Sequence, residues 1–223
     1  MAQAGMHALV SLPLRKWEAA RKEWLMLGLV LGSMLPDADN LAVAVAVITK
    51  KSSEGLHRTF THSLFSVLLV VLTFYLVGQL TKRQRWTNLG IGLGGGILMH
   101  ILLDLVLWFD GVAILWPLPF TLNLWTNVTP PGWWTTLMMP VELLFFAFFF
   151  LSLDLLARQK GSDLNFLTKL RGWTIAQAVL FVIFLVLAFV LGAMFKTIFG
   201  AVYLLSLGLA AGVAIRMRKT IEA

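Results

Sequence analysis

Five long apolar runs dominate the sequence, and each is long enough to cross a lipid bilayer as an α-helix. They cover residues 63–80, 89–108, 137–156, 173–195 and 198–215. A crossing helix needs about 20 predominantly apolar residues. A sixth apolar stretch, 24–48, is interrupted by Pro36-Asp37-Ala38-Asp39. Because the runs do not alternate polar and apolar residues as barrel strands do, the sequence predicts an all-α polytopic membrane protein with five or six membrane segments.

The composition fits a membrane protein and excludes some other classes. Hydrophobic residues make up 59% of the 223 residues, and the mean hydropathy is +0.84. The formal net charge of +7 fits cytoplasmic Lys and Arg anchors better than a nucleic-acid partner. Cysteine is absent, so disulfides and thiolate metal ligands are excluded. Without repeats or low-complexity linkers, we expect one integral membrane domain over 1–223, with the motifs in 1–120 and further spans in 130–223.

Three basic clusters orient the predicted spans. They lie at residues 82–85, 158–171 and 216–219, and all three can be cytoplasmic at once. The segment 109–135 contains no Lys or Arg and is rich in Trp, so it belongs outside. We therefore predict a multi-pass protein of the inner (cytoplasmic) membrane. In this topology His62 begins a span at the outer face, and His100 and Asp104 lie in the outer half of another.

Three short motifs place histidines and aspartates in or beside these apolar runs. In "HILLD", the ends His100 and Asp104 share one helix face because they are four residues apart. Ionisable groups inside a membrane span are costly and usually face a cavity, a partner or a metal. Taken singly, each motif has an ordinary explanation: a buried His–Asp pair, a helix-ending turn at "PDAD", and interfacial loop histidines in "HRTFTH". One metal centre explains all three, because imidazole and carboxylate together suit zinc and related divalent ions.

The candidate residues divide into metal ligands and groups for a reaction. For a divalent ion, zinc or alternatively manganese, the predicted ligands are Asp37, His57, His62, His100 and Asp104, with His7 added if it reaches the site. Arg58 is predicted to clamp a phosphate through a fork of hydrogen bonds, the alternative being an interfacial anchor. Asp39 is predicted to take up a proton as a carboxylate without a metal. Glu142, near the outer start of a span, is a weaker candidate to reach the same cavity.

The place of His7 stays open at this stage. It precedes a basic stretch with the spacing of an interfacial amphipathic helix, "RKWEAARKEW", which favours the cytoplasm. If His7 joins the metal site, we expect that stretch outside as well, with 24–48 folded as a re-entrant hairpin about Pro36. The short arms on either side of Pro36 slightly favour this hairpin. Otherwise 24–48 is one broken span, and His7 lies inside, away from the site.

The motifs "GSMLPDADN", "HRTFTHSL" and "HILLDLVLWFDGVAILWPL" resemble, in order and spacing, the YdjM-like family of bacterial and archaeal membrane proteins, described as membrane-bound metal-dependent hydrolases. The resemblance covers about residues 5–120, and Thr59 stands where that family usually has Gly. The family in turn looks like a distant relative of zinc-dependent phospholipase C and P1 nuclease. The resemblance implies the ligands of one metal ion and some of the ligands of a second. The first would be bound by Asp37, His62, His100 and Asp104. His7 would help to bind the second, with Asp39 and His57 as further ligands or their supports.

The sequence therefore predicts a membrane-bound metal-dependent hydrolase, a phosphoesterase acting on a lipid or lipid-like phosphate at the outer membrane face. Its expected partners are the lipid bilayer and that substrate. A Trp-rich outer region would admit a headgroup or form a plain aromatic belt; it comprises Trp108, Trp116, Trp125, Trp133 and Trp134. The alternatives are a metal or proton transporter and a protein whose metal only pins its helices. Ligands gathered at one depth favour the enzyme over a transporter, and their surplus over four favours catalysis over a structural metal.

Overall fold

The computed structural model describes residues 3–192 and 194–222, and these residues form a helical bundle. In chain order the elements are α1 (Ala4–Ser11), η1 (Leu12–Lys16), η2 (Glu18–Arg21), α2 (Leu25–Met34), η3 (Pro36–Asp39), α3 (Asn40–Ile48), η4 (Phe60–His62), α4 (Leu64–Thr81), α5 (Gln84–Leu107), α6 (Gly132–Lys160), η5 (Leu164–Phe166), α7 (Leu167–Val190), α8 (Met194–Arg216) and α9 (Arg218–Glu222). The described residues contain no strand, apart from one isolated bridge between Val112 and Leu122.

The predicted membrane architecture is confirmed. Five helices, α4 to α8, are long and apolar enough to span a membrane, with α7 counted from η5, and the bent pair α2–α3 makes a sixth candidate. The observed helices extend beyond several of the predicted runs. For example, α6 begins at Gly132, inside the segment predicted as an outer loop, and ends beyond the apolar run at Lys160. Its end is fixed by Gly161, whose φ of 65° suits a glycine that terminates a helix.

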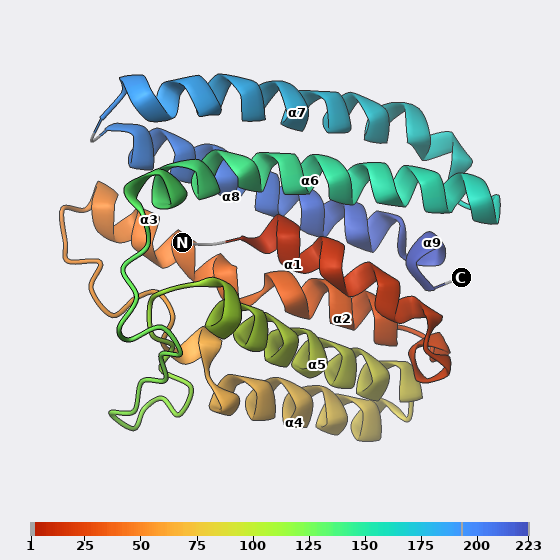
Figure 1. Ribbon diagram of the computed structural model, residues 1–223. Helices are drawn as coiled ribbons and strands as arrows, with labels where there is room; N and C mark the ends of the chain where they lie inside the picture. The colour runs from red at the N-terminus through yellow and green to blue at the C-terminus, as the bar shows by residue number, and fades with distance from the viewer. Residues whose placement is uncertain (1–2, 193, 223) are drawn as a thin grey trace.

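The bundle in Figure 1 has two chemically different ends. One end carries the residue 12–24 connection, the α4–α5 turn, the α6–η5 connection and the C-terminal helix α9. We call it the basic end, because it gathers Arg15, Lys16, Arg21, Arg83, Arg85, Lys160, Arg216 and Arg218. The opposite end carries the residue 49–63 segment and the 108–131 loop, and we call it the site end. The basic clusters therefore lie together, as the sequence predicts.

Helix α1 resolves the position of His7 in a way that the sequence reasoning did not foresee. α1 packs between α2 and α6, so His7 is fully buried inside the bundle. The residue 12–24 connection that follows it lies at the basic end, where Glu23 forms an ion pair with Arg85 at 3.9 Å. The expectation that a buried His7 requires the basic stretch on the site's side was therefore wrong. Helix α1 connects the buried His7 to the basic stretch at the basic end.

The predicted amphipathic α-helix over "RKWEAARKEW" does not form. Two short 3₁₀ segments, η1 and η2, take its place and are separated by Trp17, which is extended at ψ 137°. The connection reverses direction around the basic end between α1 and α2 (Figure 1). A straight helix would not make that reversal, whereas short turns do so and still bury Leu12 and Ala20.

The break at Pro36 is confirmed and creates a polar turn inside an apolar segment. α2 and the segment from Pro36 to Ile48 meet at a bend of 42°. Figure 1 shows α3 continuing away from the end of α2, so the re-entrant hairpin that the sequence slightly favours does not form. Proline cannot donate the backbone hydrogen bond that would continue α2, so the single turn η3 intervenes. That turn carries both Asp37 and Asp39.

Helices α2 and α5 pack with their backbones in close contact through glycines. Gly28 and Gly32 of α2 face Gly92 and Gly96 of α5, and each pair has the spacing of the small-residue motif of membrane helices. A Cβ atom added at Gly96 would lie 2.3 Å from the Leu29 carbonyl oxygen and 2.5 Å from the backbone nitrogen of Ser33. The glycine-rich stretch "GLGGG" (92–96) of α5 therefore allows the two helices to pack closely.

Candidate metal centre

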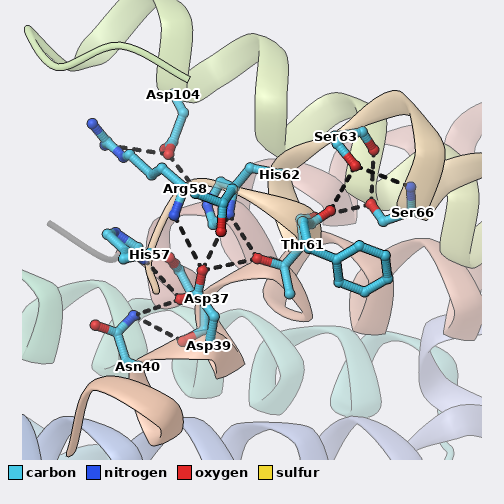
Figure 2. Close-up of polar contacts among 12 residues, drawn as sticks. Asp37, Asp39, Asn40, His57, Arg58, Thr61, His62, Ser63, Ser66 and Asp104 are labelled. Atoms are coloured by element: carbon cyan, nitrogen blue, oxygen red, sulfur yellow. Dashed lines mark hydrogen bonds and ion pairs between the residues drawn. The ribbon is translucent and has the colours of Figure 1, made fainter. Parts of the chain in front are cut away.

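Three separate segments bring the chain's four histidines into one buried cluster near the site end. His7 comes from α1, His57 precedes η4, His62 ends it, and His100 lies in α5. The ring centroids of His7 and His100 are 3.8 Å apart, and those of His62 and His100 are 4.9 Å apart. His7, His62 and His100 are completely buried, whereas the His57 side chain is 21% exposed. Figure 2 shows His57 and His62 lying close to Asp37, Asp39 and Asp104.

The hydrogen bond of His100 to the backbone fixes which of its nitrogens carries the proton. Nδ1 lies 2.7 Å from the Ser33 carbonyl oxygen, which can only accept, so Nδ1 is the donor. In the neutral ring Nε2 then carries a lone pair. This Nε2 lies 3.1 Å from Nε2 of His62. The close α2–α5 contact therefore orients the His100 ring, because Ser33 stands in α2 and His100 in α5.

A short relay through Thr61 gives His62 the same tautomer. The Thr61 hydroxyl donates to Oδ2 of Asp39 at 2.8 Å, so its oxygen accepts from Nδ1 of His62 at 3.0 Å. Nε2 of neutral His62 thus also carries a lone pair. Two lone pairs facing each other at 3.1 Å repel unless a cation lies between or beside them. This juxtaposition fits a metal ion.

His57 and His7 complete the pattern. Nδ1 of His57 donates to Oδ1 of Asp39 at 2.7 Å, leaving Nε2 buried without a hydrogen-bond partner. Nε2 of His7 donates to Oδ1 of Asp104 at 3.2 Å, leaving Nδ1 buried without a partner. Metal-binding histidines characteristically donate their second ring N–H to a carboxylate or a carbonyl. All four histidines here donate one N–H to such a group or to a hydroxyl and keep one lone pair.

Burial reinforces the neutral form of two of these rings. Desolvation lowers the pKa of His7 and the pKa of His62 below the ordinary value for histidine, although nearby carboxylates act in the opposite direction. Metal binding requires the unprotonated nitrogen, so this shift favours a metal over a proton at those two positions.

The carboxylates supply unused oxygens to the same place. Oδ2 of Asp37 accepts from the backbone N–H of Gln3 at 2.9 Å, while its Oδ1 has no hydrogen-bond partner. Oδ2 of Asp104 also makes no hydrogen bond of good geometry; it forms an ion pair with Arg58 at 3.2 Å and lies 3.7 Å from Nε2 of His62. The potential ligand atoms form three overlapping groups, within each of which the atoms lie no more than 4.8 Å apart. These groups are His7–Asp37–His100, Asp37–His57–His62 and His62–His100–Asp104. The cluster therefore has the donors that could hold a metal ion.

Arg58 brings a guanidinium to the edge of this cluster. One of its terminal nitrogens lies 3.2 Å from Asp104 and the other 3.5 Å from Asp110, and the residue is only 5% exposed. None of its three guanidinium nitrogens makes a hydrogen bond of good geometry within the described chain. Its backbone adopts φ 60°, a costly conformation for a non-glycine residue. It is held there by a donated hydrogen bond to Asp39 and one accepted from Ala113.

Asp39 supports the cluster by orienting other side chains. Its two oxygens accept from His57, from the Thr61 hydroxyl and from the backbone N–H of Arg58 (Figure 2). Both oxygens are therefore engaged, and its predicted uptake of a proton stays a prediction. Thr61 escaped the sequence analysis, although it lies inside the motif "HRTFTHSL"; its signal was a hydroxyl directly before a candidate ligand.

Glu142 reaches the region from α6 and holds the start of α1. Its Oε1 accepts from the backbone N–H of Gly5 at 2.5 Å, and its Oε2 is buried without a hydrogen-bond partner. The sequence rated it a weaker candidate, and the structure gives it contact with the helix that carries His7. Asp154 pairs with Arg158 at 2.7 Å near the other end of α6, and so lies apart from the cluster.

The six predicted ligands, Asp39 and Arg58 thus lie together in the structure, although they come from four segments that are distant in the sequence. No curated protein and no solved structure matches this chain, so the similarity to zinc-dependent phospholipase C and P1 nuclease stays a prediction. A family model described as YdjM inner membrane protein matches residues 2–199. Because that match covers most of the chain, this multi-pass protein belongs to the YdjM inner membrane protein family.

Proposed function

We propose that the protein is a metal-dependent hydrolase that cleaves phosphoesters of lipid or lipid-like molecules. One observation carries the proposal. Four lone-pair nitrogens and two carboxylates with unused oxygens converge beside a buried guanidinium whose N–H groups are not engaged in hydrogen bonds. A site that only pins helices needs four ligands and has no use for an arginine fork whose N–H groups are left without hydrogen bonds. A phosphate needs both a cationic clamp and an electrophile.

The ion would be held by His7, Asp37, His62, His100 and Asp104. Mixed imidazole and carboxylate donors fit zinc, and manganese is the alternative. When bound, such an ion supplies Lewis acidity toward a phosphoryl oxygen or a water molecule. The site would hold two ions if two of the three overlapping ligand groups bind an ion at the same time, and otherwise one.

Arg58 would bind the phosphate of the substrate. Its guanidinium lies between buried Asp104 and Asp110, whose side chain is 77% exposed, and so it bridges the cluster and the surface. A planar fork of N–H donors matches two oxygens of a phosphate. Binding would replace the weak contact with Asp110 by charge-assisted hydrogen bonds.

His57 is the group we assign to proton transfer. It is the most exposed of the four histidines, and Asp39 holds its Nδ1 so that Nε2 is available. Hydrolysis adds water to phosphorus and breaks the ester P–O bond, so one proton leaves the water and one joins the departing oxygen. Nε2 of His57 can carry that proton, with Asp39 stabilising the charged ring. The sequence prediction of His57 as a ligand is the alternative to be tested beside it.

The surface around the site favours a lipid substrate. The 108–131 loop is anchored to the segment before α4, because Ala113 donates to the Arg58 carbonyl and Leu64 donates to the Ile114 carbonyl. This loop and the start of α6 expose apolar side chains, namely Leu115, Trp116, Leu118, Phe120, Leu124, Val128 and Trp133. Such a surface suits the bilayer interface. With the basic end in the cytoplasm, the site would face the extracytoplasmic side.

The first test is the metal content of the detergent-purified protein, measured by elemental mass spectrometry. We expect near-stoichiometric zinc or manganese in the wild type and a loss of most of it in His100→Ala and Asp104→Asn. Glu18→Gln, which alters an exposed carboxylate of the residue 12–24 connection, should keep the metal. Wild-type protein that stays metal-free after supplementation with both ions would overturn the proposal.

The second test is hydrolysis of phosphoesters in mixed micelles. We expect release of the product from a lipid phosphoester by the metal-loaded wild type and a loss of roughly two orders of magnitude or more in Arg58→Gln. His57→Gln separates the two roles of that histidine. A role in proton transfer leaves the metal content unchanged and lowers kcat, whereas a ligand role lowers the metal content as well.

A further inference from the structure

A hollow at the basic end concentrates positive charge far from the His/Asp cluster. It has a volume of about 650 Å³ and lies where η1 and η2 meet the end of α6 and the C-terminal α9. We call it the basic hollow; its lining residues are Arg15, Lys16, Arg21, Gln159, Lys160 and Glu222. Four of these six residues are cations.

The cations of the basic hollow are not neutralised by neighbouring acids. Among the described residues, Arg15, Lys16, Arg21 and Lys160 take part in no ion pair. Glu222 is the one acid in the lining, and it lies 3.8 Å from Arg218. The acids of the residue 12–24 connection, Glu18 and Glu23, lie outside the lining, and Glu23 pairs with Arg85. The hollow therefore carries a net positive charge that an anion would offset.

An apolar groove adjoins the basic hollow on the side of α1 and α6. Its volume is about 520 Å³, and it shares Arg15, Lys16 and Gln159 with the hollow. The rest of its lining is mostly apolar and comprises Leu9, Val10, Leu12, Pro13, Ser152, Leu155 and Leu156. Val10 is 42% exposed and Leu155 is 58% exposed, so the groove opens toward the outside of the bundle. In a membrane protein that surface faces acyl chains.

We propose that the basic hollow and the groove together bind one anionic glycerophospholipid of the bilayer. The phosphate would lie among Arg15, Lys16 and Arg21, and an acyl chain would lie in the groove between α1 and α6. The continuity of a cationic hollow with an apolar groove argues for a lipid, because a nucleotide or free phosphate would use only the first. A basic cluster beside a membrane helix is a known kind of headgroup site. This inference does not depend on the proposed hydrolase activity, which lies near the other end of the bundle.

A bound lipid would also connect α1 to α6. The groove is formed by Leu9 and Val10 of α1 against Ser152 and Leu155 of α6. A chain filling it would hold α1, and with it His7, in place. The lipid would therefore stabilise the fold from the basic end without touching the metal cluster.

The test uses full-length protein, delipidated in mild detergent and analysed by native mass spectrometry with added dioleoylphosphatidylglycerol or dioleoylphosphatidylcholine. We expect one tightly bound phosphatidylglycerol and at least tenfold weaker binding of phosphatidylcholine. The double variant Lys16→Gln, Arg21→Gln should lose roughly tenfold or more in affinity for phosphatidylglycerol. The matched control Lys50→Gln, Lys51→Gln removes the same charge from exposed positions after α3, and it should bind like the wild type.

Further arms separate the lipid from other anions and from general charge. Val10→Trp fills the groove and keeps every cation, so it should weaken phosphatidylglycerol binding while leaving the protein folded by thermal unfolding. Equal losses in the two double variants would overturn the proposal, since the net charge alone would then account for binding. Glycerol 3-phosphate that competes as well as phosphatidylglycerol would also overturn it, because the groove would then contribute nothing.

Discussion

Helices α2 and α5 pack with their backbones in contact, whereas α6 and α8 meet through large aromatic side chains. In the first pair, glycines such as Gly32 and Gly96 leave no room even for a Cβ atom. In the second pair, Phe146 of α6 lies 6.2 Å from Tyr203 of α8 between ring centroids. The three glycines of α8, Gly200, Gly208 and Gly212, have open space where a Cβ would be.

The difference follows the position of the His/Asp cluster. The α2–α5 contact and the turn after α2 position His100, Asp104, Asp37 and Asp39, whose atoms must be fixed to fractions of an ångström for a metal. The other region is filled by large side chains, and Phe146, Phe149 and Phe150 of α6 are fully buried. Backbone contact leaves two helices few alternative positions, while aromatic packing tolerates some adjustment. We therefore expect substitutions in the two regions to affect the metal and the fold differently.

The largest effect is expected for Gly96→Leu, compared with Gly95→Leu on the adjacent position. A side chain at position 96 meets the backbone of α2 around Leu29 and Ser33, so the helices must separate and the Ser33–His100 hydrogen bond is lost. Position 95 has open space and is exposed. Gly96→Leu should give little folded protein and no bound metal, by size-exclusion chromatography and elemental analysis. Normal metal content in that variant would break the comparison.

A second pair of neighbours, Phe150 and Phe148, tests the aromatic region. Phe150 is fully buried and Phe148 is 42% exposed. Phe150→Ala leaves a cavity and should lower the free energy of unfolding by about 3–5 kcal/mol, whereas Phe148→Ala should have little effect. Both variants should keep the metal, because neither residue touches the cluster. The readouts are thermal unfolding and metal content in the same detergent; metal loss in folded Phe150→Ala would show that the two regions are not separable.

A third, smaller effect is expected from Asp39→Asn, which leaves the helix contacts intact. An amide cannot accept hydrogen bonds from both His57 and Thr61 as the carboxylate does. The preference of His57 and His62 for their present tautomers therefore becomes weaker. Loss of such a supporting group typically lowers metal affinity by 10–100-fold. Thr61→Val should show part of this loss, through His62 alone. Competition with a zinc chelator gives the affinities, and an unchanged value for Asp39→Asn would remove the supporting role of Asp39.

The apolar runs and the motifs made the membrane helices and the residues of the His/Asp cluster predictable from the sequence. Length and hydropathy set the number of spans, and "HILLD" placed two residues of the cluster on one face because helix periodicity is local. The Pro36 break was predictable for the same reason. These inferences needed no knowledge of how distant segments meet.

What the sequence did not reveal depends on contacts between distant segments. Topology rules treat a stretch before a charged cluster as lying on that cluster's side, so they could not show that the short α1 carries His7 away from Arg15 and Lys16 into the bundle. The amphipathic spacing of the basic stretch was also a weaker influence than the need to reverse direction around the basic end. The hydrogen bond that sets the tautomer of His100 is accepted by the backbone carbonyl of Ser33, a group that no side-chain pattern reports.

The smallest expected effect concerns Glu222 at the basic end, in helix α9, which contacts both α2 and α6. Burial raises the pKa of Glu222 above its ordinary value near 4.5, with the nearby Arg218 acting in the opposite direction. A raised pKa in the folded protein means that folding favours the protonated acid. Its contribution to stability is full below about pH 4.5 and is lost as the pH rises through the folded pKa. Relative to Glu222→Gln, the wild type should therefore lose about 1–2 °C in Tm between pH 4 and pH 7.

The measurement is a Tm series over that pH range for the wild type, for Glu222→Gln and for Glu18→Gln as an exposed control. The Glu222→Gln variant should equal the wild type at pH 4 and exceed it at pH 7, because the neutral amide keeps the form that burial favours. The control should follow the wild type at every pH. A wild type that instead gains stability relative to Glu222→Gln as the pH rises would mean that the ion pair with Arg218 outweighs burial. A charge interaction within α9 would then stabilise the basic end, whereas the other two regions are stabilised by packing.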